Sequence, residues 1–179
     1  TALPTDALTF FQTSESHATL SRALYDSAAL RSLRRPRGPH ARPHHVHVDV
    51  ARDEDLIPLV DALRRLRLDG TIDGVPCILN TLLIASTIAP REHWYAPTDG
   101  VIPDEVIDEI AAKIGIGRWH LRFALYDDPE IAQIKLRKAI EAFGAIPGAV
   151  IRHTTTGRDE WADLPDPSDR VYAGVPNLD

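Results

Sequence analysis

The sequence predicts an α+β fold, namely a ferredoxin-like split β-α-β unit with an antiparallel sheet and a two-helix insertion. Four short stretches have the β-branched or alternating pattern of strands, and apolar residues at helical spacing lie between them. When two helices between Val75 and Gly115 are set aside, the remaining order is β-α-β-β-α-β, which defines the split unit. A chain of 179 residues is long enough to bury one such core.

The residue pattern predicts the first strand, the first helix and the second strand. Residues 46–50 alternate valine with polar residues, as a strand with one buried face does. Asp53 is expected to cap an amphipathic helix over 54–67, because a carboxylate at that position accepts bonds from the free amides of the first turn. An Asp-Gly pair then predicts a turn, and residues 71–75 are expected to form the second strand.

The insertion is expected to consist of helices over 77–89 and 103–114. The first is apolar nearly all round, which predicts a helix that is buried or lines an apolar cavity. Pro103 suits the first position of the second helix, and Gly115 suits its left-handed end.

The second half of the unit has equally clear boundaries. Residues 119–126 are expected to form the third strand and 149–153 the fourth. Asp128 and Pro129 predict the start of the helix between them, and Gly144 predicts its end. Trp119 and Tyr126 are interpreted as packing residues of the third strand.

Composition separates a basic N-terminal arm from the rest of the chain. Residues 1–42 are rich in proline near their end and are expected to be loosely ordered. Residues 1–45 carry six arginines and three carboxylates, which gives them a net charge of +3. Because the formal net charge of the whole chain is −6, residues 46–179 carry a net charge of −9. This balance does not favour nucleic acid as a partner, and no apolar run approaches the ~20 residues of a membrane helix. The single cysteine favours a reducing, cytoplasmic location.

Several motifs, in order and spacing, resemble one known family. The resemblance begins with the segments LRLDGTI and GVP of residues 66–76 and HWY of 93–95, continues through GIGRWH of 115–120 and ALY of 124–126, and ends with AIPG of 145–148 and GVPNLD of 174–179. Residues 43–179 are therefore similar to the cap, or substrate, domain of the vanillyl-alcohol oxidase, para-cresol methylhydroxylase and eugenol oxidase family of FAD-linked oxidoreductases.

The resemblance implies the first half of a cap domain that covers the flavin and builds part of a pocket for para-substituted phenols. It implies hydride transfer from the phenol to FAD, with FAD held by an FAD-binding domain or subunit that this chain lacks. The chain alone is thus expected to bind no FAD and to be inactive, with no catalytic or cofactor-binding residue of its own. Val75, Pro76 and Leu83 are the substrate-pocket candidates that the resemblance implies, although Leu83 is equally interpreted as a buried helix residue. Half a cap also leaves apolar surface uncovered, so a homo-oligomer is expected.

Other interpretations stay open. The chain is alternatively a non-catalytic ferredoxin-like module that binds a small ligand or a partner protein. His40, His44, His45 and His47 form a metal-like cluster in which His45 and His47 share one face of a strand. They match no metal motif with fixed spacing, so no metal is expected and a solvated basic arm is the default interpretation. Cys77, at a predicted helix start, is a candidate activated thiol but is more simply a buried apolar residue.

Overall fold

The computed structural model describes residues 43–72, 74–97 and 100–157, together with Glu160, Asp163 and Asp169. These residues belong to one unit that spans 39–179. The predicted arm, 1–42, lies outside the described residues. None of the described helices has the length and apolar character that a membrane span needs.

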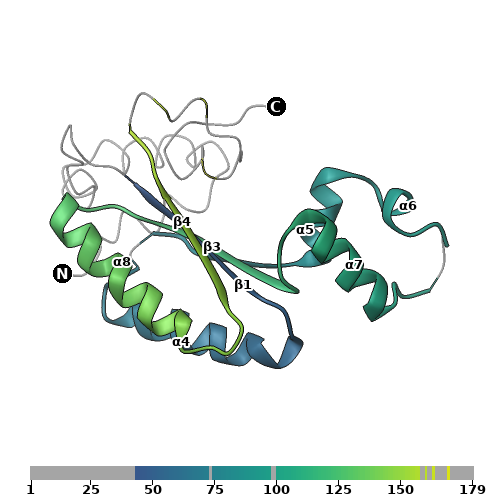
Figure 1. Cartoon of the computed structure of the whole chain (residues 1–179), viewed down its shortest axis with the longest axis horizontal. Helices are drawn as coiled ribbons and strands as arrows, with labels where there is room; N and C mark the ends of the chain where they lie inside the picture. The colour runs from purple at the N-terminus through teal and green to yellow at the C-terminus, as the bar shows by residue number, and fades with distance from the viewer. Residues whose placement is uncertain are drawn as a thin grey trace, which may run out of the picture. The chain divides into compact units, whose positions relative to one another are not determined.

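Four antiparallel strands form a single sheet with the order β2-β3-β1-β4 (Figure 1). They are β1 (His44–Val50), β2 (Cys77–Asn80), β3 (Trp119–Leu125) and β4 (Val150–Thr155). β3 pairs with β1 on one side and β2 on the other, so the two strands joined by the first long helix are not neighbours. The predicted α+β class and antiparallel sheet are confirmed, whereas the ferredoxin-like label stays a prediction.

The core lies between one face of this sheet and two helices, α4 (Leu56–Leu68) and α8 (Pro129–Gly144), which Figure 1 shows on the same side. Alternate residues of β1 and β3 point to this side because side chains in a strand alternate between the two faces. The fully buried members of the cluster are Val46, Val48, Val50, Leu59, Ala62, Ile72, Leu121, Phe123, Leu125, Ala139 and Phe143. Burying each large side chain stabilises the fold by roughly 1.5–3 kcal/mol.

The start of the first helix differs from the prediction. A short 3₁₀ turn, η1 (Asp53–Asp55), precedes α4, and the Asp53 side chain caps neither. Its carboxylate instead accepts bonds from Arg118 and from the indole of Trp119 at the beginning of β3. Asp53 thus binds residues distant in sequence, and not the free amides of the helix that it was predicted to cap.

The second strand was predicted at 71–75, and this is wrong, because β2 spans Cys77–Asn80. Residues 71 and 72 close the end of α4 instead. The amide of Thr71 donates to the Asp69 carboxylate, and the amide of Ile72 donates to the carbonyl of Leu66. These groups are therefore already satisfied and do not take part in a ladder. Ile72 is β-branched and fully buried, so in sequence it resembles a strand residue.

The insertion contains α5 (Thr81–Ile88), α6 (Arg91–Trp94) and α7 (Asp104–Ile114), which Figure 1 shows together at one end of the sheet. The predicted helix 77–89 begins at Thr81, because Asn80 accepts the amide of Leu83 and caps α5. This helix was predicted to be buried or to line an apolar cavity, and the first alternative is wrong, since only Thr81 and Ala85 are buried in α5. The predicted stop of α7 is confirmed: Gly115 has a left-handed φ of 81°.

Candidate functional site

The sheet face opposite α4 and α8 carries a row of polar side chains. The side chains of His45, His47 and Asp49 alternate with the buried valines of β1 and so lie on this face. His120 of β3 is directly opposite Asp49. The prediction that His45 and His47 share one face is confirmed, and both contact the same third residue.

Asp49 is the most connected residue of this face. Its Oδ1 accepts from His120 Nδ1 at 2.8 Å and from the amide of Gly117 at 3.0 Å, and its Oδ2 accepts from Arg152 at 2.5 Å. Burial on its own would raise the pKa of Asp49. The hydrogen bonds from His120 and Gly117, with the nearby charges of His120 and Arg152, outweigh burial and lower that pKa. Asp49 is therefore an ionised carboxylate with three donors.

The polar row continues along the sheet from His120. His120 Nε2 lies 3.3 Å from His47 Nδ1, within hydrogen-bond distance. His47 Nε2 and His45 Nδ1 each lie 3.3 Å from Asp169 Oδ1, and both contacts are ion pairs without hydrogen-bond geometry. Burial would raise the pKa of Asp169, but the two imidazoles lower it on balance, so this carboxylate is also ionised.

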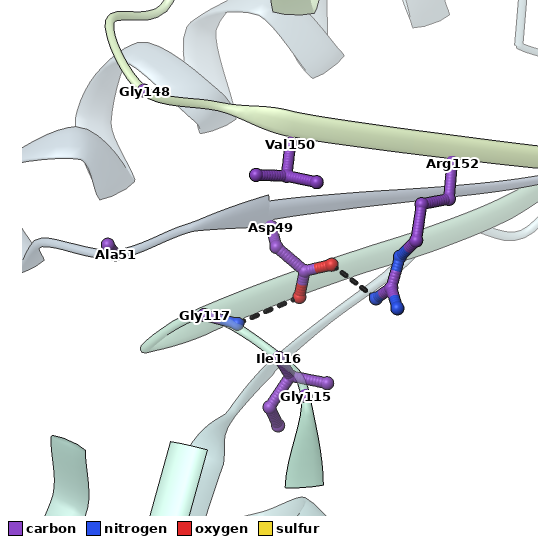
Figure 2. Close-up of a pocket in the computed structure, with 8 residues that line it drawn as sticks. All are labelled: Asp49, Ala51, Gly115, Ile116, Gly117, Gly148, Val150 and Arg152. Atoms are coloured by element: carbon purple, nitrogen blue, oxygen red, sulfur yellow. Dashed lines mark hydrogen bonds and ion pairs between the residues drawn. The ribbon is translucent and has the colours of Figure 1, made fainter. Parts of the chain in front are cut away.

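A pocket of about 220 Å³ opens beside Asp49 (Figure 2). Its polar wall is the Asp49–Arg152 pair, and its remaining walls come from Ala51, Val150, Gly148 and the segment 115–117. Small-molecule sites usually measure about 300–1,000 Å³. The pocket is therefore too small for a dinucleotide cofactor.

Gly117 brings the 115–117 segment against β1. A Cβ at Gly117 would lie 2.4 Å from the carbonyl oxygen of Val50, which no side chain tolerates. Only glycine allows the close approach by which the Gly117 amide reaches the Asp49 carboxylate. The GIG sequence is thus a structural requirement of this site.

The three substrate-pocket candidates lie elsewhere. Val75 and Pro76 precede β2, and Leu83 is in the first turn of α5. None of them lines the pocket beside Asp49. Val75 is 74% exposed and Leu83 is 51% exposed, so the interpretation of Leu83 as a buried helix residue is wrong.

Two further expectations are corrected. Cys77 is the first residue of β2, opposite Arg122, so no helix N-terminus lies beside its thiol. His44 and His45 are buried in β1, so they do not belong to a solvated arm. His40 lies outside the described residues. Among the described side chains, no group of three His, Cys, Asp or Glu residues has a geometry suited to a metal ion.

Sequence reasoning missed Asp49 and His120. The alternation of β1 was a sufficient signal for Asp49, because it places this residue on the same face as His45 and His47. His120 could not be assigned in the same way. Its contact with Asp49 depends on the register between β1 and β3, which are about 70 residues apart in sequence.

Comparison with known proteins finds relatives of one kind. No family model matches the chain. The chain is 29% identical over 145 residues to the 4-cresol dehydrogenase (hydroxylating) flavoprotein subunit of Pseudomonas putida, a match that covers 80% of this chain and 27% of that protein. The crystal structure of p-cresol methylhydroxylase with substrate bound superposes with a TM-score of 0.63 at 30% identity, and the match covers 78% of this chain and 26% of that chain.

A second solved structure shares the fold. The 4-ethylphenol oxidase from Gulosibacter chungangensis, in its isoeugenol complex, superposes with a TM-score of 0.59 at 21% identity over 75% of this chain and 27% of that chain. This chain therefore spans about a quarter of the length of the relatives that it matches. The resemblance that the sequence motifs predicted is confirmed.

Proposed function

Because the chain is homologous to one segment of the p-cresol methylhydroxylase flavoprotein subunit, we propose that it is a substrate-side cap segment of an FAD-dependent oxidoreductase acting on para-substituted phenols. The observation that carries this proposal is the match to p-cresol methylhydroxylase, with 30% identity and a TM-score of 0.63 over 78% of the chain. The relatives are named for 4-cresol and 4-ethylphenol, which are both para-substituted phenols. Under this proposal the segment alone is inactive.

The pocket beside Asp49 does not fit FAD. The pocket beside Asp49, about 220 Å³, is smaller than the roughly 300–1,000 Å³ of ordinary ligand sites. The proposal therefore places FAD in an FAD-binding domain or subunit, which is the partner of this segment. When bound there, FAD would accept the hydride that the phenol loses.

Val75, Pro76 and Leu83 are the residues that we propose to contact the phenol. The exposure of Val75 and Leu83 supports this role, because an apolar side chain that completes a pocket with a partner is uncovered without that partner. They flank β2, which is an edge strand of the sheet. In the complete enzyme, Leu83→Ala is expected to raise the Kd for a para-alkyl phenol about 10-fold, since one buried leucine is worth roughly 1.5–3 kcal/mol.

A hybrid protein tests the proposed function. In the P. putida flavoprotein subunit, the segment that matches this chain is replaced by the corresponding residues of this chain. We expect the purified hybrid to retain flavin at the stoichiometry of the parent. As a matched control, the same segment is taken from the G. chungangensis oxidase, which shares the fold at low identity with this chain. Loss of flavin from the hybrid, with flavin retained in the control, would contradict the proposal.

The pocket beside Asp49 favours a second candidate, a non-catalytic module that binds a small ligand or a partner protein. That function predicts a ligand-induced rise in Tm for the chain alone with ligands small enough for the pocket. Cap function predicts no such response to para-alkyl phenols or to FAD. A cytoplasmic location and a homo-oligomer both stay predictions, and light scattering over micromolar concentrations tests the second.

A further inference from the structure

We propose that the pocket beside Asp49 binds a small apolar monocarboxylate, and that Arg152 holds the carboxylate of this ligand. Such binding is separate from the proposed cap function, because Val75, Pro76 and Leu83 do not line this pocket. It also gives the second candidate function, a module that binds a small ligand, a definite class of ligand.

The walls of the pocket are apolar except where Asp49 and Arg152 lie. Val150 of β4 is opposite Asp49 of β1, and Arg152 follows two positions later on the same face of β4. The other walls carry small or apolar side chains or none, because they come from Ala51, Ile116 and three glycines. The pocket therefore suits a ligand with an apolar body and one polar group, placed where Arg152 lies.

The polar wall of the pocket has hydrogen-bond donors to spare, but few acceptors. The Asp49 carboxylate already accepts from His120, from the amide of Gly117 and from Arg152. Arg152 uses one terminal nitrogen for this bond, which Figure 2 shows, and a guanidinium has five N–H donors in all. Its side chain is 51% exposed, so the remaining N–H groups are accessible. This wall therefore favours a ligand that accepts hydrogen bonds.

The charges around the pocket favour a carboxylate over a neutral acceptor. A carboxylate can accept two N–H groups of one guanidinium, and such charge-assisted bonds are stronger than bonds between neutral groups. The formal charges of Arg152 and Asp49 cancel, and Arg122 adds positive charge to the same row of the sheet, opposite His47. Asp169 contacts His47 further along this face and does not line the pocket. A ligand cation, in contrast, would meet the guanidinium of Arg152.

The volume of the pocket limits the size of this ligand. About 220 Å³ is the space of roughly seven water molecules, at about 30 Å³ each in the liquid. A short chain or a single ring with one carboxylate fits within that space, and benzoate is a suitable probe. Arg152 is the one cationic side chain among the residues that line the pocket, so a second carboxylate on the ligand would find no cation there.

NMR titration of the ¹⁵N-labelled chain with three probes tests the site. We expect benzoate to shift the amide signals of Gly115, Gly117 and Gly148 along saturable curves, because these residues form walls of the pocket. Benzamide has the shape of benzoate without its charge, and acetate has the charge without the ring. Each is expected to bind at least about 10-fold more weakly than benzoate. Benzamide or acetate that binds as tightly as benzoate, or benzoate that causes no saturable shift, would overturn the proposal.

A variant tests which residue holds the carboxylate. Arg152→Gln keeps a hydrogen-bond donor but removes the charge, so we expect the Kd for benzoate to rise at least about 10-fold. The matched control is Arg137→Gln, which removes the same charge from an exposed position of α8, on the other side of the sheet, and should leave the Kd unchanged.

Equal Kd values for benzoate in Arg152→Gln and the parent chain would show that the proposal is wrong. If Arg152→Gln does not fold, the three probes on the parent chain still decide whether the site exists. Neither result bears on the cap function, because the hybrid flavoprotein tests that function through its flavin.

Discussion

The Asp49 side chain joins three parts of the fold. It lies on β1, and it binds His120 of β3, Arg152 of β4 and the amide of Gly117 in the loop before β3. A buried carboxylate is tolerated only when such donors compensate for its lost hydration. The position of Gly117, and with it one wall of the pocket, therefore depends on this one side chain.

Replacing Asp49 tests that dependence. Asp49→Asn is expected to lower the free energy of unfolding by about 1–3 kcal/mol, because donors around a buried acceptor lose their charged partner. The matched control is Arg152→Ala, whose side chain is half exposed and whose loss is expected to cost no more than about 1 kcal/mol. Urea unfolding of both variants gives the comparison. Equal effects would contradict the assignment of Asp49 as the central residue.

The two glycines of the GIG sequence should respond differently to alanine. Gly117→Ala forces a Cβ against the Val50 carbonyl, so we expect a loss of roughly 3 kcal/mol or more. Gly115→Ala has open space and a strained φ of 81°, for which about 1 kcal/mol is expected. Thermal unfolding measures both losses, and a larger loss at Gly115 would show that the packing argument is wrong.

At the scale of elements, Arg118 attaches the insertion to the sheet. Arg118 directly precedes β3, and its guanidinium contacts Asp108 at 2.8 Å and Asp104 at 3.0 Å, both on α7, and Asp53 of η1 at 3.0 Å. The hydrogen bond to Asp108 is the largest cause of the raised pKa of Arg118, which therefore stays charged. A planar fork with several donors is what allows one residue to serve three carboxylates.

Removing the fork should loosen α7. Arg118→Lys keeps the charge but loses the divergent donors, so we expect the α7 amides to exchange with solvent several-fold faster while those of β1 are unchanged. Hydrogen exchange read by mass spectrometry makes this measurement. Arg52→Lys is the matched control, because the ion pairs of Arg52 with described residues, Glu54 and Asp55, lie within its own turn. Unchanged α7 exchange in Arg118→Lys would refute the attachment.

The end of α4 and the middle of α8 are joined by a pH-dependent contact between Asp69 and Lys138. The bond from Lys138, at 2.6 Å, is the main cause that lowers the pKa of Asp69 to about 2. The folded state thus binds the proton less well than the unfolded chain, whose aspartates titrate near about 3.9. The contribution is fully present above that pH and is lost as pH falls to about 2.

The free energy of unfolding of Asp69→Asn should therefore differ from that of the parent protein above the range from about pH 4 to about pH 2, and not below it. Urea midpoints of the two proteins are expected to be separated at pH 6 and to converge as the pH falls from about 4 to about 2. A separation that persists below pH 2 would show that the Asp69 charge is not responsible.

Elements with local signals were predicted well, and elements set by distant contacts were not. The stop of α7 at Gly115 and the start of α8 at Pro129 are encoded within a few residues. β2 was displaced because nothing local distinguishes a buried Ile72 in a helix-closing turn from a strand residue. The polar side chains of the sheet follow the same rule. The alternation of β1 was enough to predict the face on which Asp49 lies, but its contact with His120 could be predicted only from the register between β1 and β3.

At the scale of the molecule, the two faces of the sheet differ in chemistry. One face is closed by α4 and α8 over an apolar core, and the other carries the histidine–carboxylate row and the pocket. The exposed substrate-pocket candidates Val75 and Leu83 belong neither to the apolar core nor to the pocket beside Asp49. The family resemblance came from motifs spread over the chain, so the scaffold was predictable, whereas the polar row arises only when β1, β3 and β4 are paired.

The most direct test of cap function is whether this segment supports phenol oxidation in a flavin-containing protein. The hybrid flavoprotein subunit is mixed with 4-methylphenol without oxygen, and the absorbance of its flavin is followed. We expect phenol-dependent bleaching of the flavin, as in the parent subunit. A hybrid that retains its flavin but is not reduced by any para-alkyl phenol would contradict it.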